Sequence, residues 1–187
     1  EAYNISLSAE VDTDDPEVTT FAGDGTFGST NATGTAASFR YPYAISAVGT
    51  NLYVVDRENH RIRKIVLSTG VVTTLAGSSS GFADATGISA RFKRPRGITT
   101  DGTNLYVVDT DNHLIRKIVI STGAVTTLAG DAGSSGSTDG TGISARFKKP
   151  KGITTDGTNL YVSDTDNHLI RKIVISTGEV STLAGSS

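Results

Sequence analysis

The 187-residue sequence contains no cysteine, no methionine and no tryptophan. Without cysteine, a disulfide framework, a thiolate metal site and a thiol nucleophile are all excluded. Apolar residues nowhere form a run of the roughly 18 that a membrane-spanning helix needs, so we expect no membrane span. The formal net charge of −2 excludes a globally basic nucleic-acid-binding protein, although it leaves local basic patches open.

The polar residues are mostly threonine, serine, glycine, asparagine and aspartate, with few lysine–glutamate pairs. This composition of polar residues is typical of a secreted or surface-exposed β-protein. We therefore expect an extracellular or cell-envelope location.

One stretch of the sequence is repeated. The letters NHLIRKIVISTG occur at residues 112–123 and again at 167–178, and a looser copy occupies 59–70. Other features, including a proline and an Ala-Gly step, recur with the same period of about 54 residues. A period of this length indicates an array of supersecondary units, none of which buries its own faces alone.

Each unit contains four strand-like segments joined by tight turns. In the second unit these segments are GITT, LYVVD, HLIRKIVIS and AVTTLAG, and turn-forming letters such as DGTN and STG separate them. The third segment is apolar on both faces at several points, which is typical of a strand packed between two layers. These residues are Leu114, Ile115, Ile118, Val119 and Ile120. Four-stranded units whose two faces pack on neighbours are the blades of a β-propeller.

The copies of the four segments differ in number. The sets of first, second and third strands begin near Ala44, Gly97 and Gly152. Fourth strands are predicted at residues 18–22, 72–76, 125–129 and 180–184.

The residues VVDTDNHLIRKI, preceded by PRGITTDGTNLY, resemble the NHL repeat, which is named for the triplet found here at Asn112, His113 and Leu114. The linking stretch GFADATGISARFKRPRGI also resembles the connection between blades in bacterial and plant NHL proteins. The resemblance covers residues 17–187 and implies an all-β propeller, usually of six blades. We expect three four-stranded blades, at about 17–70, 71–123 and 124–187, as half of a six-bladed ring.

Three blades do not close a ring, because propellers need about four to eight. We expect the missing half to come either from a second copy, in a dimer that completes a six-bladed ring, or from further blades of a longer chain. Residues 1–16 stand outside the repeat, and their alternating pattern predicts a half-buried strand followed by an acidic hinge. That strand is either an edge strand or a donor that links subunits head to tail; its apolar residues are Tyr3, Ile5, Leu7, Ala9 and Val11.

Three histidines at equivalent places suggest a metal site, but equivalent positions in the outer half of successive blades diverge from the axis. We therefore interpret each Asp, Asn and His set as a structural corner that holds the turn between the second and third strands. The Asp-rich turns at 12–15, 109–112 and 164–167 leave calcium as an alternative, although they lack the glycine and distant glutamate of a calcium loop. We expect no metal and no cofactor at the corner residues, which are Asp56, Asn59, His60, Asp109, Asn112, His113, Asp164, Asn167 and His168.

Two basic stretches, RFKRPRG and RFKKPKG, precede the first strand of the second and third units, and the first unit has SFRYPYA instead. Basic and aromatic side chains near a channel mouth would form a surface that attracts and stacks on anions. Such a surface would suit an acidic protein or polysaccharide better than nucleic acid, although NHL domains of tripartite-motif proteins bind RNA there. Alternatively, these residues form a solvated rim, with Asp84 and Asp139 pairing to two of the arginines. The candidate residues are Arg91, Lys93, Arg94, Arg96, Arg146, Lys148, Lys149, Lys151, Tyr41 and Tyr43.

For function we predict a non-enzymatic scaffold or protein-interaction module that assembles with copies of itself. The alternative is a ligand-binding or hydrolytic propeller, because some six-bladed relatives are lyases or lactonases that use histidine and carboxylate ligands near the channel. The predicted axial strand Ile98–Thr100 carries neither residue type, and no Gly-x-Ser-x-Gly nucleophile motif occurs.

Overall fold

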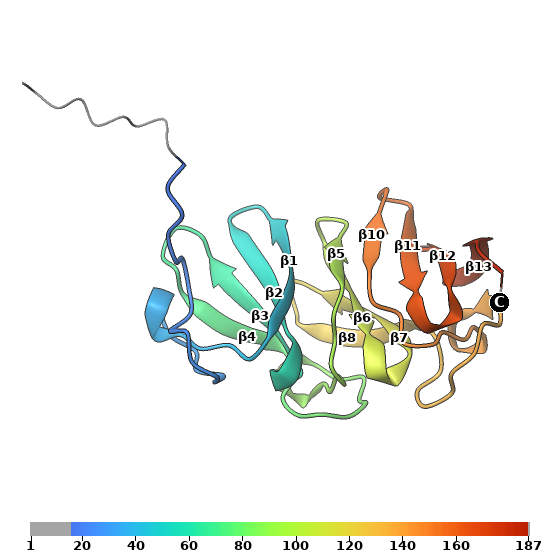
Figure 1. Ribbon diagram of the computed structural model, residues 1–187, viewed down its shortest axis with the longest axis horizontal. Helices are drawn as coiled ribbons and strands as arrows, with labels where there is room; N and C mark the ends of the chain where they lie inside the picture. Colours follow the sequence, from blue (N-terminus) through green and yellow to red (C-terminus); the bar gives the residue numbers. More distant parts are fainter. Residues whose placement is uncertain (1–15, 187) are drawn as a thin grey trace, which may run out of the picture.

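The computed structural model describes residues 16–186, which form three antiparallel β-sheets arranged side by side in one row (Figure 1). The fold class predicted from the repeat, a partial β-propeller of four-stranded blades, is confirmed. The predicted strand-donor segment Tyr3–Val11 and the Asp-rich turn at 12–15 lie outside the described residues.

The strands follow one another in chain order within each sheet. The first blade consists of β1 (Pro42–Val48), β2 (Asn51–Asp56), β3 (Arg61–Val66) and β4 (Val72–Ala76). The second consists of β5 (Ile98–Thr100), β6 (Asn104–Asp109), β7 (Leu114–Val119) and β8 (Ala124–Ala129). The third consists of β10 (Ile153–Thr155), β11 (Asn159–Asp164), β12 (Leu169–Val174) and β13 (Glu179–Ala184), with the short β9 (Gly140–Thr141) paired on β13.

The remaining regular structure is six short 3-10 turns. Three lie in the connections before the blades, η1 (Gly34–Ala36), η3 (Gly87–Ser89) and η5 (Gly142–Ser144). Three join the second strand of a blade to the third, η2 (Arg57–Asn59), η4 (Thr110–Asn112) and η6 (Thr165–Asn167). Within the described chain, no helix is long and apolar enough to cross a membrane.

The blade boundaries differ from those expected. The boundaries at about 17–70, 71–123 and 124–187 put the fourth strand of one unit at the start of the next. In the structure β4 pairs with β3, β8 with β7 and β13 with β12, so each fourth strand belongs to the same sheet as the three strands before it in the chain. The sheets therefore span residues 42–76, 98–129 and 140–184.

The strand predicted at residues 18–22 is not formed. Val18 is 96% exposed, whereas its repeat equivalent Val72 is 1% exposed. The Gly23 amide nevertheless donates to the Gly34 carbonyl at 3.2 Å, as the Gly77 amide does to Gly87 at 3.1 Å. The segment thus enters at the place of a fourth strand, but the described residues offer no third strand beside it, and an extended segment without a partner does not form a ladder.

The core lies between the blades. Side chains alternate along β6, so Leu105 and Val107 pack toward the first blade while Tyr106 and Val108 pack toward the third. Both faces of this central blade are therefore buried, as a strand that is apolar on both faces predicts. Phe92, from the connection before the second blade, is fully buried in the first of these cores.

Replacing Phe92 with alanine should lower the free energy of unfolding by about 3–5 kcal/mol, because it opens a cavity between two blades that cannot fully collapse. Chemical denaturation monitored by circular dichroism measures this loss. Phe27→Ala is the matched control, since Phe27 is 74% exposed and its truncation should change stability by less than about 0.5 kcal/mol. Equal losses in the two variants would contradict the location of the core.

Candidate functional site

A fully buried arginine connects each blade to the connection that precedes it. In the second blade, Arg116 donates from Nη1 to Asp109 Oδ2 at 2.9 Å and to the Arg91 carbonyl at 3.1 Å. Its Nη2 donates to Asp84 Oδ1 at 2.6 Å and to the Ala83 carbonyl at 2.9 Å. One guanidinium therefore joins β7, the end of β6 and two points of the connection that leads into β5.

Asp109 uses both of its carboxylate oxygens at this corner. Oδ1 accepts from the Lys93 amide at 2.7 Å, and Oδ2 accepts from Asn112 Nδ2 at 2.8 Å as well as from Arg116. Burial raises the pKa of Asp109 to about 6, although Arg116 and the hydrogen bonds oppose this shift. These oxygens serve the chain itself, so this geometry does not support the calcium alternative for the 109–112 turn.

A similar network recurs in the outer blades, although in the first blade Asn31 takes the place of the second carboxylate. Arg63 binds Asp56 at 2.8 Å in the first blade, and Arg171 binds Asp164 at 3.0 Å in the third. Each guanidinium also lies over a phenylalanine of the connection, at 5.0–5.1 Å from the ring centre. The phenylalanines are Phe39, Phe92 and Phe147.

The expected pairing of Asp84 with Arg91 and of Asp139 with Arg146 is wrong. Asp84 pairs with Arg116 and Asp139 pairs with Arg171, whose charges are buried and require carboxylate partners. Arg146 instead pairs with Asp131 at 3.1 Å. The sequence interpretation missed the three buried arginines, although each stands at the same place in the third strand of its blade, seven residues after the corner aspartate.

The histidines join neighbouring blades. His60 Nδ1 accepts from the Arg94 amide at 3.1 Å, and His113 Nδ1 accepts from the Lys149 amide at 3.0 Å. His168, the third of the set, is exposed at the end of the row. Desolvation lowers the pKa of both His60 and His113, which favours the neutral ring that can accept this bond. In the part of the chain that the structure covers, no three His, Asp or Glu side chains gather as a metal-binding group.

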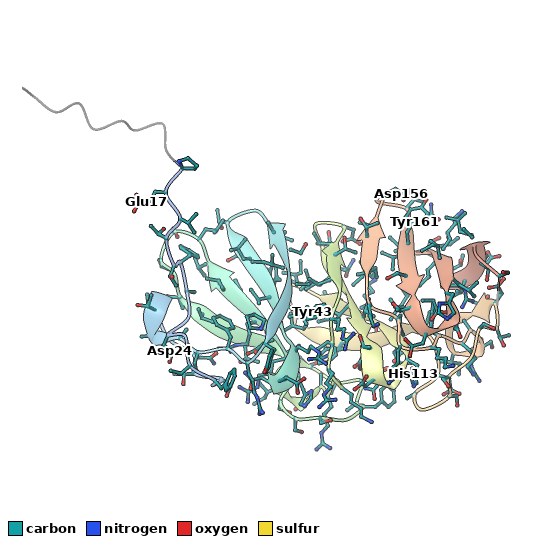
Figure 2. All side chains as sticks on the ribbon, in the orientation of Figure 1. Glu17, Asp24, Tyr43, His113, Asp156 and Tyr161 are labelled. Carbon is teal, nitrogen blue, oxygen red and sulfur yellow. The ribbon has the colours of Figure 1, made fainter. Side chains whose placement is uncertain are left out.

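The basic residues lie at the same end of the sheets as the η2, η4 and η6 turns; Figure 2 places His113 at this end and Asp156 with Tyr161 at the opposite one. Several of the charges are engaged. Arg94 is 3.3 Å from Glu58 and 3.8 Å from Asp111. Exposed lysines complete this rim, namely Lys93, Lys148 and Lys149, with Lys151 half-buried.

The first blade replaces rim charges with aromatic rings. Tyr41 stacks on Phe27 with 5.5 Å between ring centres. Tyr43 lies between two guanidinium groups, at 6.0 Å from Arg57 and 5.5 Å from Arg96. The structure thus brings Tyr43 and Arg96 together and keeps Tyr41 apart from the basic residues, on the outer side of the first blade.

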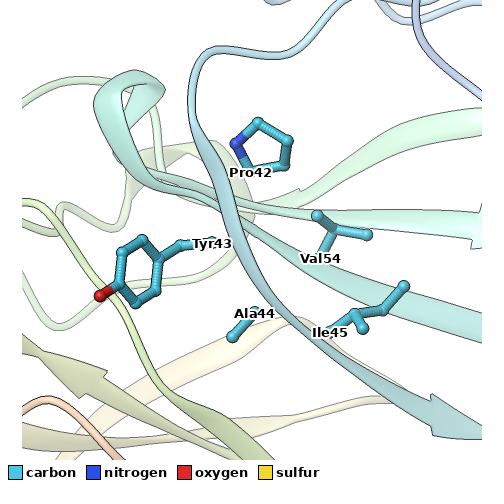
Figure 3. A pocket seen from close by; sticks show the side chains of 5 residues that line it. All are labelled: Pro42, Tyr43, Ala44, Ile45 and Val54. Atoms are coloured by element: carbon cyan, nitrogen blue, oxygen red, sulfur yellow. The ribbon is translucent and has the colours of Figure 1, made fainter.

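The outer face of the first blade, here called the N-face, carries a groove. It consists of the side chains that point away from the second blade, and residues 20–22 cover it only in part. The groove measures about 350 Å³, and a neighbouring hollow of about 250 Å³ is lined by residues 42–45 and Val54 (Figure 3). Ile45 and Val54 pair across β1 and β2, and Ile45 is 57% exposed there. The N-face side chains are Ala37, Phe39, Ile45, Leu52, Val54, Ile65 and Val72.

The outer face of the third blade, here called the C-face, is also apolar. Ile170 is 41% exposed and Leu183 is 56% exposed, whereas Ile115, the equivalent of Ile170 in the second blade, is fully buried. The face that is buried in the second blade is therefore exposed to solvent in the third blade, at the end of the row. The C-face side chains are Tyr161, Ser163, Ile170, Leu183 and Ala184.

Comparison with models of protein families finds no match. A curated human protein, NHL repeat-containing protein 2, is 33% identical over 180 residues, which are 87% of this chain and 25% of the human protein. The chain thus spans about a quarter of that relative's length. Among solved structures, a protein of unknown function from Bacteroides thetaiotaomicron superposes with a TM-score of 0.61 at 29% identity, over 70% of this chain and 32% of that one.

A structure of virginiamycin B lyase from Staphylococcus aureus also superposes, with a TM-score of 0.54 over 79% of this chain and 42% of the lyase. The identity is 18%, so this likeness concerns the fold alone.

Replacing Arg116 with alanine should lower the free energy of unfolding by about 3–5 kcal/mol, because it leaves the Asp109 carboxylate buried without its cation. Arg116→Lys should recover only part of this loss, since an ammonium cannot bridge the two carboxylates and two carbonyls. Urea denaturation measures both variants. Glu58→Gln is the control. It removes the carboxylate that pairs with Arg57 and Arg94 near the surface and should cost about 1 kcal/mol or less; a loss that matched that of Arg116→Ala would contradict the buried network.

The contribution of His113 to stability should be lost as the pH drops below about 6.5, because His113 is harder to protonate in the folded chain than in the unfolded chain. The lowered pKa means that the unfolded state binds the proton first, so the contribution is present above pH 6.5 and is lost on acidification. Asp111, Lys149, Lys93 and Asp164 also act on this ring.

The variant His113→Gly tests this, since glycine accommodates the backbone φ of 62° at that position. Between pH 7.5 and 5, the thermal midpoint of the wild type should fall relative to that of the variant. The buried Asp109 titrates in both proteins, so its contribution cancels in the comparison. Parallel curves would contradict the role of His113.

Proposed function

We propose that this chain, which belongs to the NHL-repeat β-propeller proteins, is a non-enzymatic scaffold that assembles through the open faces of its end blades. The observation that carries the proposal is the C-face, where Ile170 and Leu183 are exposed at places that are covered inside the row. Contiguous apolar side chains on a soluble protein mark an interaction site.

The N-face supports the same function. Its groove runs between residues 20–22 and the side chains of β1, β2 and β3, so apolar surface is accessible at this end also. A propeller blade is an antiparallel sheet that needs a neighbour on each face to bury its apolar side chains. The first and third blades each have one such neighbour in the described chain. On the outer face of the first blade, Val54, Ile65 and Val72 are buried in a cluster that includes Ala22 and Ala32, and Ile45 is left 57% exposed.

An enzymatic role has less support. The likeness to the lyase is one of fold, and β5 contributes Ile98, Thr99 and Thr100 to the inner side of its blade rather than acids or imidazoles. Binding of polyanions by the rim is also less favoured, because Arg94 and Arg146 are already paired with carboxylates.

The test is the solution mass as a function of concentration, measured by light scattering. The wild type should rise above 19.4 kDa with concentration, and Ile170→Asp should weaken this association by about tenfold or more, because a charge would be buried in the contact. Ile88→Asp is the matched control, since Ile88 is exposed on a connection away from both end faces and its replacement should leave association unchanged. A wild type that stays at 19.4 kDa at all concentrations would contradict the proposal.

A further inference from the structure

We infer that the partner is a second copy of this chain, docked head to tail, with the C-face of one copy on the N-face of the other. At this junction His168 of the first copy accepts a hydrogen bond from the Tyr41 amide of the second. The inference rests on the proposed function, because it names the occupant of the same open faces.

The first argument is the identity of the faces. The second blade and its connection meet the first blade through seven side chains: Ala90, Phe92, Ile98, Leu105, Val107, Ile118 and Val125. The N-face carries the same residue types at the equivalent positions, in order Ala37, Phe39, Ile45, Leu52, Val54, Ile65 and Val72. The surface that receives a blade inside the row is thus present again, unchanged in residue type, at the end of the row.

The C-face is the matching half of this contact. The second blade meets the third through Tyr106, Val108, Ile115, Leu128 and Ala129. The C-face has Tyr161, Ser163, Ile170, Leu183 and Ala184 at these places, so four of the five residue types agree. At each interface inside the row, a blade face equivalent to the C-face packs on a blade face equivalent to the N-face. The N-face is therefore complementary to a C-face and not to another N-face.

The second argument is the backbone at the junction. The residue that donates its amide to the histidine of the preceding blade has a left-handed conformation, with φ 47° at Arg94 and 45° at Lys149. Tyr41 occupies the equivalent position and has φ 53°. Such a conformation is costly for a non-glycine residue and persists where surrounding contacts impose it. The Tyr41 amide is therefore already oriented as the two internal donors are.

The acceptor is prepared in the same way. His60, His113 and His168 share the left-handed conformation, with φ of 58°, 62° and 61°. The first two place Nδ1 against an amide of the next blade. His168 presents the same group at the C-face end, where the described chain supplies no further blade.

Docking has one structural consequence for residues 18–22. They enter at the place of the fourth strand of a preceding blade, which in the assembly is the place of β13 of the docked copy. Of these two segments, β13 is hydrogen-bonded into a sheet, through β12, whereas residues 18–22 form no strand. The docked copy therefore displaces residues 18–22 from the N-face and covers the groove that they leave half open.

Head-to-tail contacts close into a ring when the rotation per blade allows it. Two copies would supply six blades and two identical junctions, a blade number within the range in which propellers close. Both open faces of each copy would then be covered, and the mass would stop at twice 19.4 kDa.

The test is a mixing experiment with two variants, Ile45→Asp on the N-face and Ile170→Asp on the C-face. Alone, each variant should be monomeric by light scattering, because every head-to-tail junction would contain one charged face. An equimolar mixture should form a heterodimer, since the intact N-face of one variant meets the intact C-face of the other. It should bind more weakly than the wild type, because it has one intact junction instead of two.

The outcomes separate the two proposals. A monomeric wild type contradicts the proposed function itself. A wild type that associates while either variant alone still dimerises supports the proposed function but overturns the head-to-tail junction, because like faces would then be pairing. A mixture that stays monomeric overturns it as well.

His168→Gly tests the hydrogen bond at the junction. Glycine keeps the left-handed backbone and removes the acceptor, so the dimer dissociation constant should rise by roughly tenfold over the two junctions. The thermal midpoint of the monomeric Ile45→Asp variant should not change when His168→Gly is added to it. His113→Gly is the matched control, which should lower that midpoint because its bond lies inside the chain. Unchanged dimer affinity in His168→Gly would overturn the assignment of His168.

Discussion

The structure depends on a buried arginine held by two carboxylates. Arg116 lies in the same strand as the core residues Leu114, Ile115 and Ile118, and its charge is removed from solvent. A buried cation of this kind needs hydrogen-bond acceptors, and here Asp109, Asp84 and two backbone carbonyls accept from its Nη1 and Nη2 groups. The carbonyls belong to the connection that leads into the blade, so the network sets the path of that connection. The path in turn brings Phe92 into the gap between blades and the basic residues to the rim.

A second constraint follows from alternation along the strands. Because neighbouring residues of β6 face opposite blades, each blade is complete only with two neighbours. The chain satisfies this for the second blade and leaves one face of the first and of the third without a blade. This makes the ends, rather than a central pocket, the surfaces with the strongest reason to bind. The rim is different in kind, since part of its charge is already neutralised by carboxylates of the chain.

The histidines show how a repeated motif can have a role that its chemistry alone does not suggest. Three imidazoles in register resemble a set of metal ligands, yet two of them accept a backbone amide from the next blade. Their left-handed backbone follows from the 3-10 turn that precedes each of them. The motif is thus part of the contact between blades, and the copy at the end of the row is the one available to another molecule.

The sequence by itself determined the repeat, the four strands of each unit, the apolar third strand and the propeller class, because these depend on local patterns of period two and on turn-forming residues. It also identified the Asp, Asn and His positions that lie at the corners. Only the tertiary structure decided that Asp84 binds Arg116 and not Arg91, because these residues meet through a connection and a strand that are 32 positions apart. In the same way, residues 18–22 have a sequence pattern typical of a strand but do not form one, since a strand requires a hydrogen-bonding neighbour. The local sequence determines whether a segment can adopt strand conformation, and a neighbouring strand decides whether it forms part of a sheet.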